Sequence, residues 1–205
     1  MHPSPAFLIA ALVLALTPGP GIAYVVARTA AGGRAEGLAS CVGTGLGGLF
    51  HVCAAAFGLS LLLAQSAAAF AVVKYVGAAY LLYLGVRLLV SKAPAAPGAV
   101  VAGGPRRALV EGVLVEALNV KTALFFVAFL PQFLVSGRPP VPQLVAMGAI
   151  CVALNTLVDV AAVLGAARLL GPELAAQRRA RLLSKASGVT LVGLGLYVAA
   201  ARRGA

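Results

Sequence analysis

The sequence predicts an all-α integral membrane protein with six transmembrane helices, on three observations. Of its 205 residues, 61% are hydrophobic and only 10% are charged, against roughly 25% charged residues in an ordinary soluble domain. Apolar stretches of about 20 residues, long enough to cross a hydrocarbon core of ~30 Å, recur from end to end. The cations lie mainly between these stretches. A soluble core cannot bury this much apolar surface, so a soluble class is excluded.

The six spans are predicted as helices because each apolar run is long and rich in Leu, Ala and Val. They are expected at about 6–27, 38–63, 67–90, 110–135, 142–167 and 185–202. The whole chain, 1–205, is expected to form a single transmembrane transporter domain. Its segment at about 91–109 is rich in Ala, Pro and Gly, which is typical of a flexible linker. This linker separates two half-repeats of three spans each, about 1–90 and 110–205.

The charge distribution predicts the orientation of the chain. The first, third and fifth connections hold 11 of the 16 Lys and Arg residues, and the opposite side, including the C-terminus, holds four. The positive-inside rule places the cation-rich side in the cytoplasm, the linker with it, and both termini outside. The net charge of +11 comes from these connections and forms no basic stripe interleaved with aromatic residues. The expected environment is therefore the lipid bilayer, and no nucleic-acid partner is expected.

Three spans per half give the two halves opposite topology, an inverted repeat of the kind common in secondary transporters. The third span of each half begins with Lys-x-x-Gly, at Lys74 to Gly77 and again at Lys185 to Gly188. A run rich in Gly, Leu and Tyr follows in both. Small residues allow neighbouring membrane helices to approach closely. The glycines expected at helix–helix contacts are Gly43, Gly47, Gly77 and Gly85.

The first span is interrupted by Thr17-Pro18-Gly19-Pro20, about 12 residues or roughly 18 Å into the bilayer. Two prolines remove two backbone donors and disfavour helix at Thr17 and Gly19. Backbone groups freed at this depth need a polar partner or a cavity. The half-helix that follows would offer N–H groups to an anion such as a carboxylate. We expect these four residues to bind substrate; the alternative is a purely structural kink.

The fourth span carries a second polar group, Glu116 to Lys121, also near the midplane. A cation at this depth costs about 2.5–3.5 kcal/mol, so Lys121 is expected to face the interior and to pair with an acid. Asp159 is the expected partner, because Glu116 lies about 140° away round an ideal helix. Asn119 and Lys121 are predicted substrate-binding residues, and Glu116, Asp159 and Lys121 a coupling or ion-pair group. A structural ion pair between helices is the alternative.

The remaining chemistry-bearing residues predict neither an enzyme nor a metal or cofactor site. His51, alone in the second span, is expected to make a hydrogen bond between helices. The three cysteines show no metal-ligand spacing. No nucleophile–base pair, HExxH motif or ATP-binding motif is present. The competing hypotheses are a metal or inorganic cation exporter of related architecture, a membrane-embedded enzyme, and a scaffold or sensor.

With these motifs the chain resembles the lysine exporter (LysE) / homoserine–threonine resistance (RhtB) family of small bacterial amino-acid exporters, over essentially its whole length. The matching features are the Thr-Pro-Gly-Pro turn, the glycine-rich second span, and the tyrosine-bearing third span. The fourth span adds Asn-x-Lys, Phe-Phe and Pro-Gln-Phe, and the matched positions are Thr17 to Pro20, Gly43 to Gly48, Gly77 to Gly85, Asn119 to Lys121, Phe125-Phe126 and Pro131 to Phe133.

The chain departs from this family at two positions. Gly21 stands where family members usually have Asn, and Val120 stands where they have proline. Without that proline, the second break can be a polar helix instead of a true interruption. The resemblance implies a secondary transporter in the bacterial cytoplasmic (inner) membrane that exports amino acids or close derivatives. It also implies proton antiport as the driving reaction and a homodimer as one possible assembly.

Overall fold

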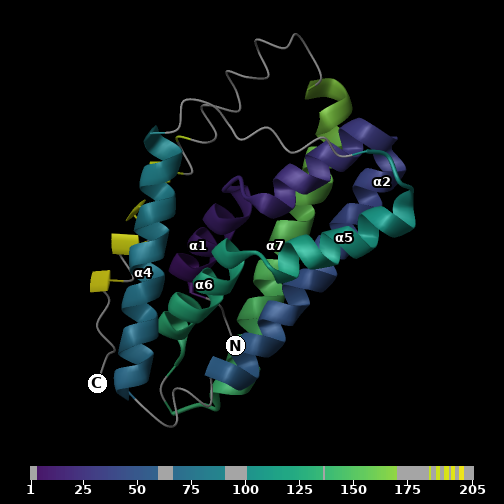
Figure 1. Cartoon of the computed structure of the whole chain (residues 1–205). Helices are drawn as coiled ribbons and strands as arrows, with labels where there is room; N and C mark the ends of the chain where they lie inside the picture. The colour runs from purple at the N-terminus through teal and green to yellow at the C-terminus, as the bar shows by residue number, and fades with distance from the viewer. Residues whose placement is uncertain are drawn as a thin grey trace.

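The computed structural model describes residues 4–59, 67–90, 101–135 and 137–169, with scattered positions between 185 and 200. These residues form helices and no β-strand, which confirms the predicted all-α class (Figure 1). In chain order the elements are α1 (Pro5–Leu16), α2 (Pro20–Cys53), η1 (Ala54–Leu59), α4 (Ala67–Val90), α5 (Pro105–Ala117), α6 (Val120–Ala128), η2 (Leu130–Phe133) and α7 (Pro140–Leu169). The described positions from 185 onward are helical as well. In order, these helices correspond to the six predicted spans.

Helix α2 contains the turn between the first two spans. Gly33 has φ 75° and ψ −171°, a left-handed backbone that glycine adopts because it has no Cβ. This residue divides α2 into a short limb, residues 20–32, and a long limb, residues 34–53. The loop expected at 28–37 is therefore a sharp turn between two helical limbs, seen where the chain turns back at the upper right of Figure 1. The short limb completes the first span with α1, and η1 extends the second.

The predicted linker is shorter than expected where the structure describes it. Helix α5 begins at Pro105, whose fixed φ suits the first helical position, so residues 105–109 are helical. Residues 101–104 carry no helix, and 91–100 lie outside the described residues. The fourth span consists of α5 followed by α6 and η2, two segments bent by 45° at a short break.

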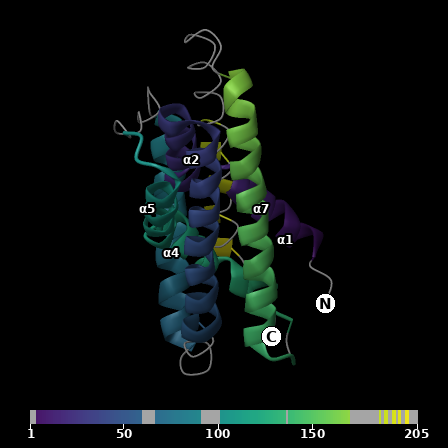
Figure 2. The same ribbon diagram turned by 90° about the vertical axis from the view of Figure 1, so that its right-hand side faces the viewer.

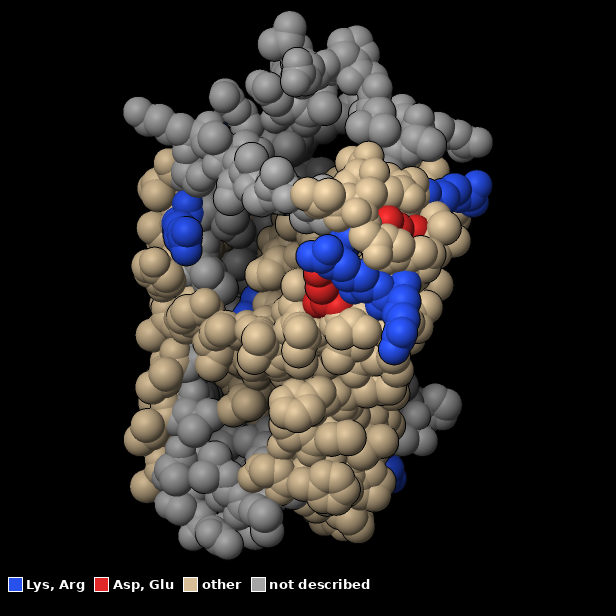
Figure 3. All heavy atoms as spheres, turned by 45° about the vertical axis from the view of Figure 1, so that its right-hand side comes forward, with Lys and Arg blue, Asp and Glu red and all other residues tan. Residues whose placement is uncertain are grey.

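Large apolar side chains lie exposed on the surface, and the interior holds charged residues besides its apolar core. Large side chains such as Phe50, Phe57 and Leu157 are more than 60% exposed, whereas Glu116 and Asp159 are buried. On the face drawn in Figure 3, most charged atoms lie in the upper half, and broad areas carry none. By length and composition, two helices in the described part of the chain can cross a membrane, and the bent fourth span makes a third.

Helix α7 runs along the length of the molecule (Figure 2), and one of its faces carries apolar and polar residues in succession. Leu144, Met147 and Cys151 pack in the larger apolar core with Phe7, Leu14 and a phenylalanine cluster from α6 and η2. One turn further lies polar Asn155, and Asp159 follows after another turn. Val163 then packs in a second, smaller apolar cluster. Spacing of four residues keeps these side chains on one helix face.

The glycine-rich second span lies against α5 at close range. A Cβ placed on Gly47 would lie 2.6 Å from the carbonyl oxygen of Val113, and one on Gly112 would lie 2.9 Å from that of Ser40. Gly43 faces the same stretch of α5. On α4, Gly85 faces the backbone of Gly188 in the last helix in the same way. Gly77 lies in α4, but its surroundings fall outside the described residues.

Candidate functional site

The first break separates α1 from α2 as the prolines predict. Helix α1 ends at Leu16, and Thr17 and Gly19 are both extended, with ψ of 115° and −174°. The Thr17 hydroxyl donates to the carbonyl of Val13 at 2.7 Å. Gly19 is the N-cap residue of α2 and has no side chain to cap it, and Pro20 begins the helix. The carbonyls before the break and the first turn after it therefore lack their helical partners.

The second break is a true interruption although Val120 replaces the proline. Helix α5 ends at Ala117, and Asn119 is extended, with ψ 100°. The Asn119 side-chain oxygen accepts from the backbone N–H of Lys121 at 3.1 Å, which makes Asn119 the N-cap of α6. Asparagine competes with the helix for backbone partners and favours N-cap positions. An N-cap side chain thus gives the interruption that a proline would otherwise impose.

Lys121 joins the two breaks. Its Nζ donates to the carbonyl oxygen of Thr17 at 2.9 Å and to that of Leu14 at 3.3 Å. Leu14 lies in the last turn of α1 and Thr17 is its C-cap residue. The Leu14 carbonyl also accepts from the Thr17 N–H at 3.2 Å, because Pro18 has no N–H to offer it. The expected direct ion pair with Asp159 is not formed: within the described part of the chain, no carboxylate lies within 4.0 Å of the Lys121 ammonium. The tertiary fold provides carbonyl acceptors instead.

Glu116 is held by donors from its own break. Asn119 donates to its Oε2 at 2.9 Å, and the Thr122 hydroxyl donates to its Oε1 at 2.7 Å. The His51 ring donates through Nε2 to the Glu116 backbone carbonyl at 2.8 Å, the hydrogen bond between helices expected of this histidine. A Cβ on Gly21 would lie 2.7 Å from Oε2, so the first turn of α2 closes against this carboxylate.

Asp159 lies on α7 opposite this group and is also buried. The Thr44 hydroxyl lies 3.0 Å from its Oδ2 and 3.0 Å from the carbonyl oxygen of Cys41. One hydroxyl proton can serve only one of these acceptors at a time. Among the described residues no cation pairs with Asp159 within 4.0 Å. A buried carboxylate with a single neutral donor is costly, so this group is suited to take up a cation or a proton.

The two breaks and these charges surround one small cavity of about 30 Å³, which is room for about one or two water molecules. Its walls come from α1, both limbs of α2, α5, α6 and α7. They are formed by Ala15, Thr17, Gly21, Ile22, Thr44, Gly45, Gly48, Glu116, Asn119, Lys121, Thr122, Val152, Asn155, Thr156 and Asp159. One ammonium and two carboxylates therefore share a mixed polar and apolar chamber.

Most of the predicted site residues line this cavity. Thr17, Asn119, Lys121, Glu116 and Asp159 do so directly. The other three residues of the first break, positions 18–20, form its turn beside the cavity. Among the described residues, no group of three or more His, Cys, Asp or Glu side chains could hold a metal ion.

Sequence reasoning missed the threonines that hold the two carboxylates. Thr44 and Thr122 are common residues in membrane helices, and nothing in their spacing distinguishes them from packing residues. It also missed Arg28 and Glu36, which it placed in a loop, although both are buried. The signal available for these two was their opposite charge eight residues apart beside a glycine pair.

Several known proteins are similar to this chain in sequence. The family model described as LysE type translocator matches residues 12–202. A protein of Vibrio cholerae called an uncharacterized membrane protein is 30% identical over 96% of both chains. A homoserine/homoserine lactone efflux protein of Salmonella typhimurium is 28% identical over 96% of both. A leucine efflux protein of the same organism is 33% identical over 62% of this chain and 61% of its own length.

No solved structure matches the chain. The family model covers all but the first residues and the last few, and it includes both breaks and every charged residue of the cavity. This chain belongs to the LysE type translocator family of membrane proteins.

Proposed function

We propose that this protein exports amino acids or close derivatives across the bacterial cytoplasmic membrane by alternating access, driven by proton antiport. The observation that carries the proposal is the cavity in which Lys121, Glu116 and Asp159 meet between two broken helices. An amino acid carries one ammonium and one carboxylate, and this chamber offers groups of both signs. The names of two relatives, efflux proteins for homoserine and for leucine, support this substrate class. Transport moves the substrate without chemical conversion, so no enzymatic activity is proposed.

The residues divide between the two ends of the substrate. Lys121 and the first turn of α6 offer positive charge and N–H groups to the carboxylate. The carbonyls around Thr17 and the side chain of Asn119 offer hydrogen bonds. Asp159 and Glu116 offer negative charge to the substrate ammonium, and Asp159, with its single neutral donor, is the better candidate to carry the coupling proton.

Flux in proteoliposomes tests the proposal. Purified protein is expected to move homoserine or leucine at a rate that rises with an imposed pH gradient. Lys121→Met removes the ammonium that lines the cavity and is expected to lower this flux by at least about tenfold. Asp159→Asn, which cannot exchange a proton, is expected to abolish the response to the gradient.

Arg138→Gln is the matched control, because it removes an exposed cation far from the cavity along the chain. Its flux is expected to equal that of the unaltered protein. Full flux by the Lys121→Met protein would remove the role given to that ammonium. If flux through the unaltered protein does not change with the pH gradient, proton antiport is refuted, but amino-acid export is not.

A further inference from the structure

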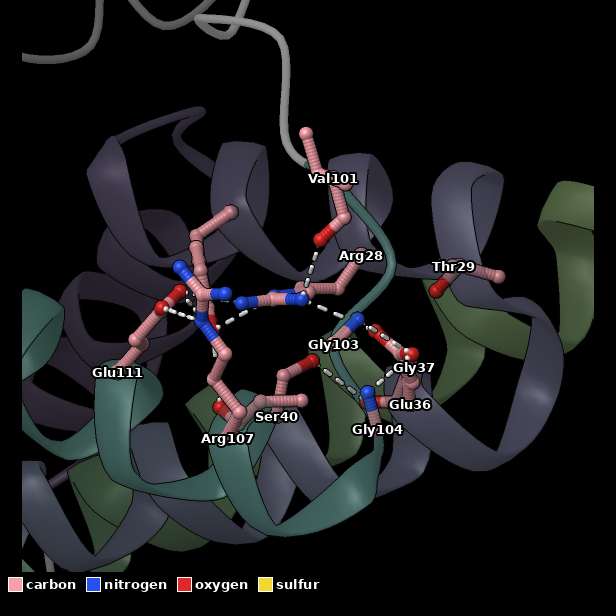
Figure 4. Close-up of polar contacts among 12 residues, drawn as sticks. Arg28, Thr29, Glu36, Gly37, Ser40, Val101, Gly103, Gly104, Arg107 and Glu111 are labelled. Atoms are coloured by element: carbon pink, nitrogen blue, oxygen red, sulfur yellow. Dashed lines mark hydrogen bonds and ion pairs between the residues drawn. The ribbon is translucent and has the colours of Figure 1, made fainter.

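An ion cluster around the buried Arg28 lies at the cation-rich end of the molecule, outside the cavity. We define it by Arg28 on the short limb of α2, Glu36 on the long limb and Glu111 on α5. Arg28 is 1% exposed, and its Nη1 lies 3.0 Å from Oε2 of Glu36. Its Nη2 pairs with Glu111, and its Nε donates to the hydroxyl of Tyr24 at 3.0 Å. Figure 4 shows the guanidinium lying between the two carboxylates.

The cluster also holds the chain segment that leads into α5. Nη1 of Arg28 donates to the carbonyl oxygen of Val101 at 2.9 Å. Oε1 of Glu36 accepts from the backbone N–H groups of Gly103 and Gly104 at 3.0 and 2.7 Å (Figure 4). One salt-bridged pair therefore joins the short limb, the long limb and the start of the second half of the chain.

A thin apolar layer separates this cluster from the cavity. It consists of Val25, Cys41 and Val163, which are between 0% and 1% exposed and pack on one another. Each lies three or four residues, about one helical turn, from a residue of the cavity wall. Those wall residues are Gly21, Thr44 and Asp159. Along both limbs of α2 the order is therefore cavity, apolar layer and ion cluster, and α7 adds Val163 to the layer.

The short limb has a non-helical residue at each of its ends. Gly19 is extended where the limb leaves the first break, and Gly33 has a left-handed backbone where it meets the long limb. Between these two residues, the short limb carries Gly21 of the cavity wall, Val25 of the apolar layer and Arg28 of the ion cluster. Hinges are commonly such element-terminal residues, because they absorb changes in φ and ψ while the helix between them stays rigid.

We propose that the apolar layer and the ion cluster are the gate that closes the cavity toward the cation-rich end, with the short limb as its moving element. In the present structure Val25, Cys41 and Val163 are packed together and buried, which is the closed state of this gate. Substrate that enters from that side requires the short limb to swing about Gly19 and Gly33. The motion separates Arg28 from Glu36 and exposes the apolar layer to water. That the gate admits an amino acid rests on the transport function proposed above. That the gate opens and closes does not depend on that function.

Cys41 is a natural reporter for this opening. In a full-length protein that keeps Cys41 but carries Cys53→Ala and Cys151→Ala, the thiol is buried in the closed gate. Inside-out vesicles expose the cation-rich side to a membrane-impermeant maleimide. Glu36→Gln keeps the acceptor for the two glycine N–H groups but removes the charge that pairs with Arg28. We expect the labelling rate of Cys41 to rise by about tenfold, the scale of a typical coupling between two states.

Two controls separate gate opening from a general loosening of the fold. Arg34→Gln removes an exposed cation from the same turn, where it makes no ion pair with any described residue, and should leave the rate unchanged. In the second control Cys151 is the single remaining thiol. It is 0% exposed but lies in the larger apolar core beyond the cavity. Its labelling should not respond to Glu36→Gln. Arg28→Lys tests the same pair from its other side and should accelerate Cys41 labelling less than Glu36→Gln does.

Labelling of Cys41 that stays within about twofold of the unaltered rate in both the Glu36→Gln and Arg28→Lys proteins would overturn the gate. An equal rise at Cys151 would also overturn it, because the substitution would then have loosened the whole bundle. A rise at Cys41 alone supports the gate, whether or not the reconstituted protein moves amino acids. Failure of the transport assay with a positive labelling result would count against the proposed substrate class and leave the gate intact.

Discussion

At the scale of single residues, the cavity shows how charges are kept at bilayer depth. The Lys121 ammonium donates to two backbone carbonyls at the end of α1. Glu116 has donors at both of its oxygens, whereas the Thr44 hydroxyl is the one donor to Asp159 among the described residues. A buried polar group that lacks hydrogen-bond partners costs free energy. A carboxylate with fewer donors therefore gains more by binding a proton or a substrate ammonium. Of the two carboxylates of the cavity, Asp159 has the fewer donors among the described residues.

Gly21 is predicted to position the carboxylate of Glu116. A Cβ at residue 21 would lie 2.7 Å from Oε2, so Gly21→Ala must push this oxygen away from the Asn119 amide. We expect the KM for export to rise by about three- to tenfold, with a smaller change in maximal rate. The measurement is a concentration series of efflux from proteoliposomes, together with the unfolding temperature in detergent.

Gly58→Ala is the matched control for this substitution. A Cβ at residue 58 meets nothing within 4 Å, so the same change of residue is tolerated there without displacement. Its KM should equal that of the unaltered protein. An unaltered KM in the Gly21→Ala protein would show that the Glu116 carboxylate can move without weakening substrate binding. That result would contradict the positioning role of Gly21.

At the scale of elements, the two breaks are built by different chemistry. Two prolines impose the first, and an N-cap asparagine makes the second. Both leave a half-helix whose N-terminus lies at mid-depth, which is the arrangement that favours an anionic group. With the break at Asn119, the first span of each predicted half is interrupted, and the inverted repeat stays a prediction.

Asn119→Ala is expected to destabilise the fourth span and to impair export. Losing the cap removes the acceptor for the Lys121 N–H, which costs about 1 kcal/mol in typical helices, and it also removes a donor to Glu116. Ser4→Ala removes an equivalent cap from α1, where the Ser4 hydroxyl accepts from Phe7 N–H at 3.2 Å. Both variants should unfold at a lower temperature in detergent, but only Asn119→Ala should reduce efflux. Equal efflux by the Asn119→Ala and Ser4→Ala proteins would show that Asn119 caps α6 and has no role in substrate binding.

At the scale of the whole molecule, the charge distribution sets a testable orientation. The connection at Arg34 belongs to the cation-rich side and the one at Arg138 to the other. In a background without the three native cysteines, an impermeant maleimide added to intact cells should label Arg138→Cys and spare Arg34→Cys. Inside-out vesicles should give the opposite result. The reverse pattern would place the proposed gate on the outer side.

The way the whole molecule packs separates the site residues that could be predicted from the sequence from those that could not. Proline, asparagine and intramembrane charge signal a helix break or a functional group by their chemistry alone, so Thr17, Asn119, Lys121, Glu116 and Asp159 could be found without a structure. The partner of Lys121 could not, because it depends on which carbonyls the packed helices bring near. Arg28 and Glu36 were hidden for a related reason: charges beside a turn are usually exposed, and only the meeting of three segments buries them.

The sequence by itself determined the membrane class, the six helices and the position of both polar interruptions. Those features follow from hydrophobic length, proline and charge, which act locally along the chain. The tertiary structure alone decided that the two interruptions share one cavity and that Lys121 caps α1. It also decided that an apolar layer separates the cavity from the ion cluster around Arg28. These are contacts between residues far apart in the chain, and their geometry is set by the packing of helices and not by any local pattern.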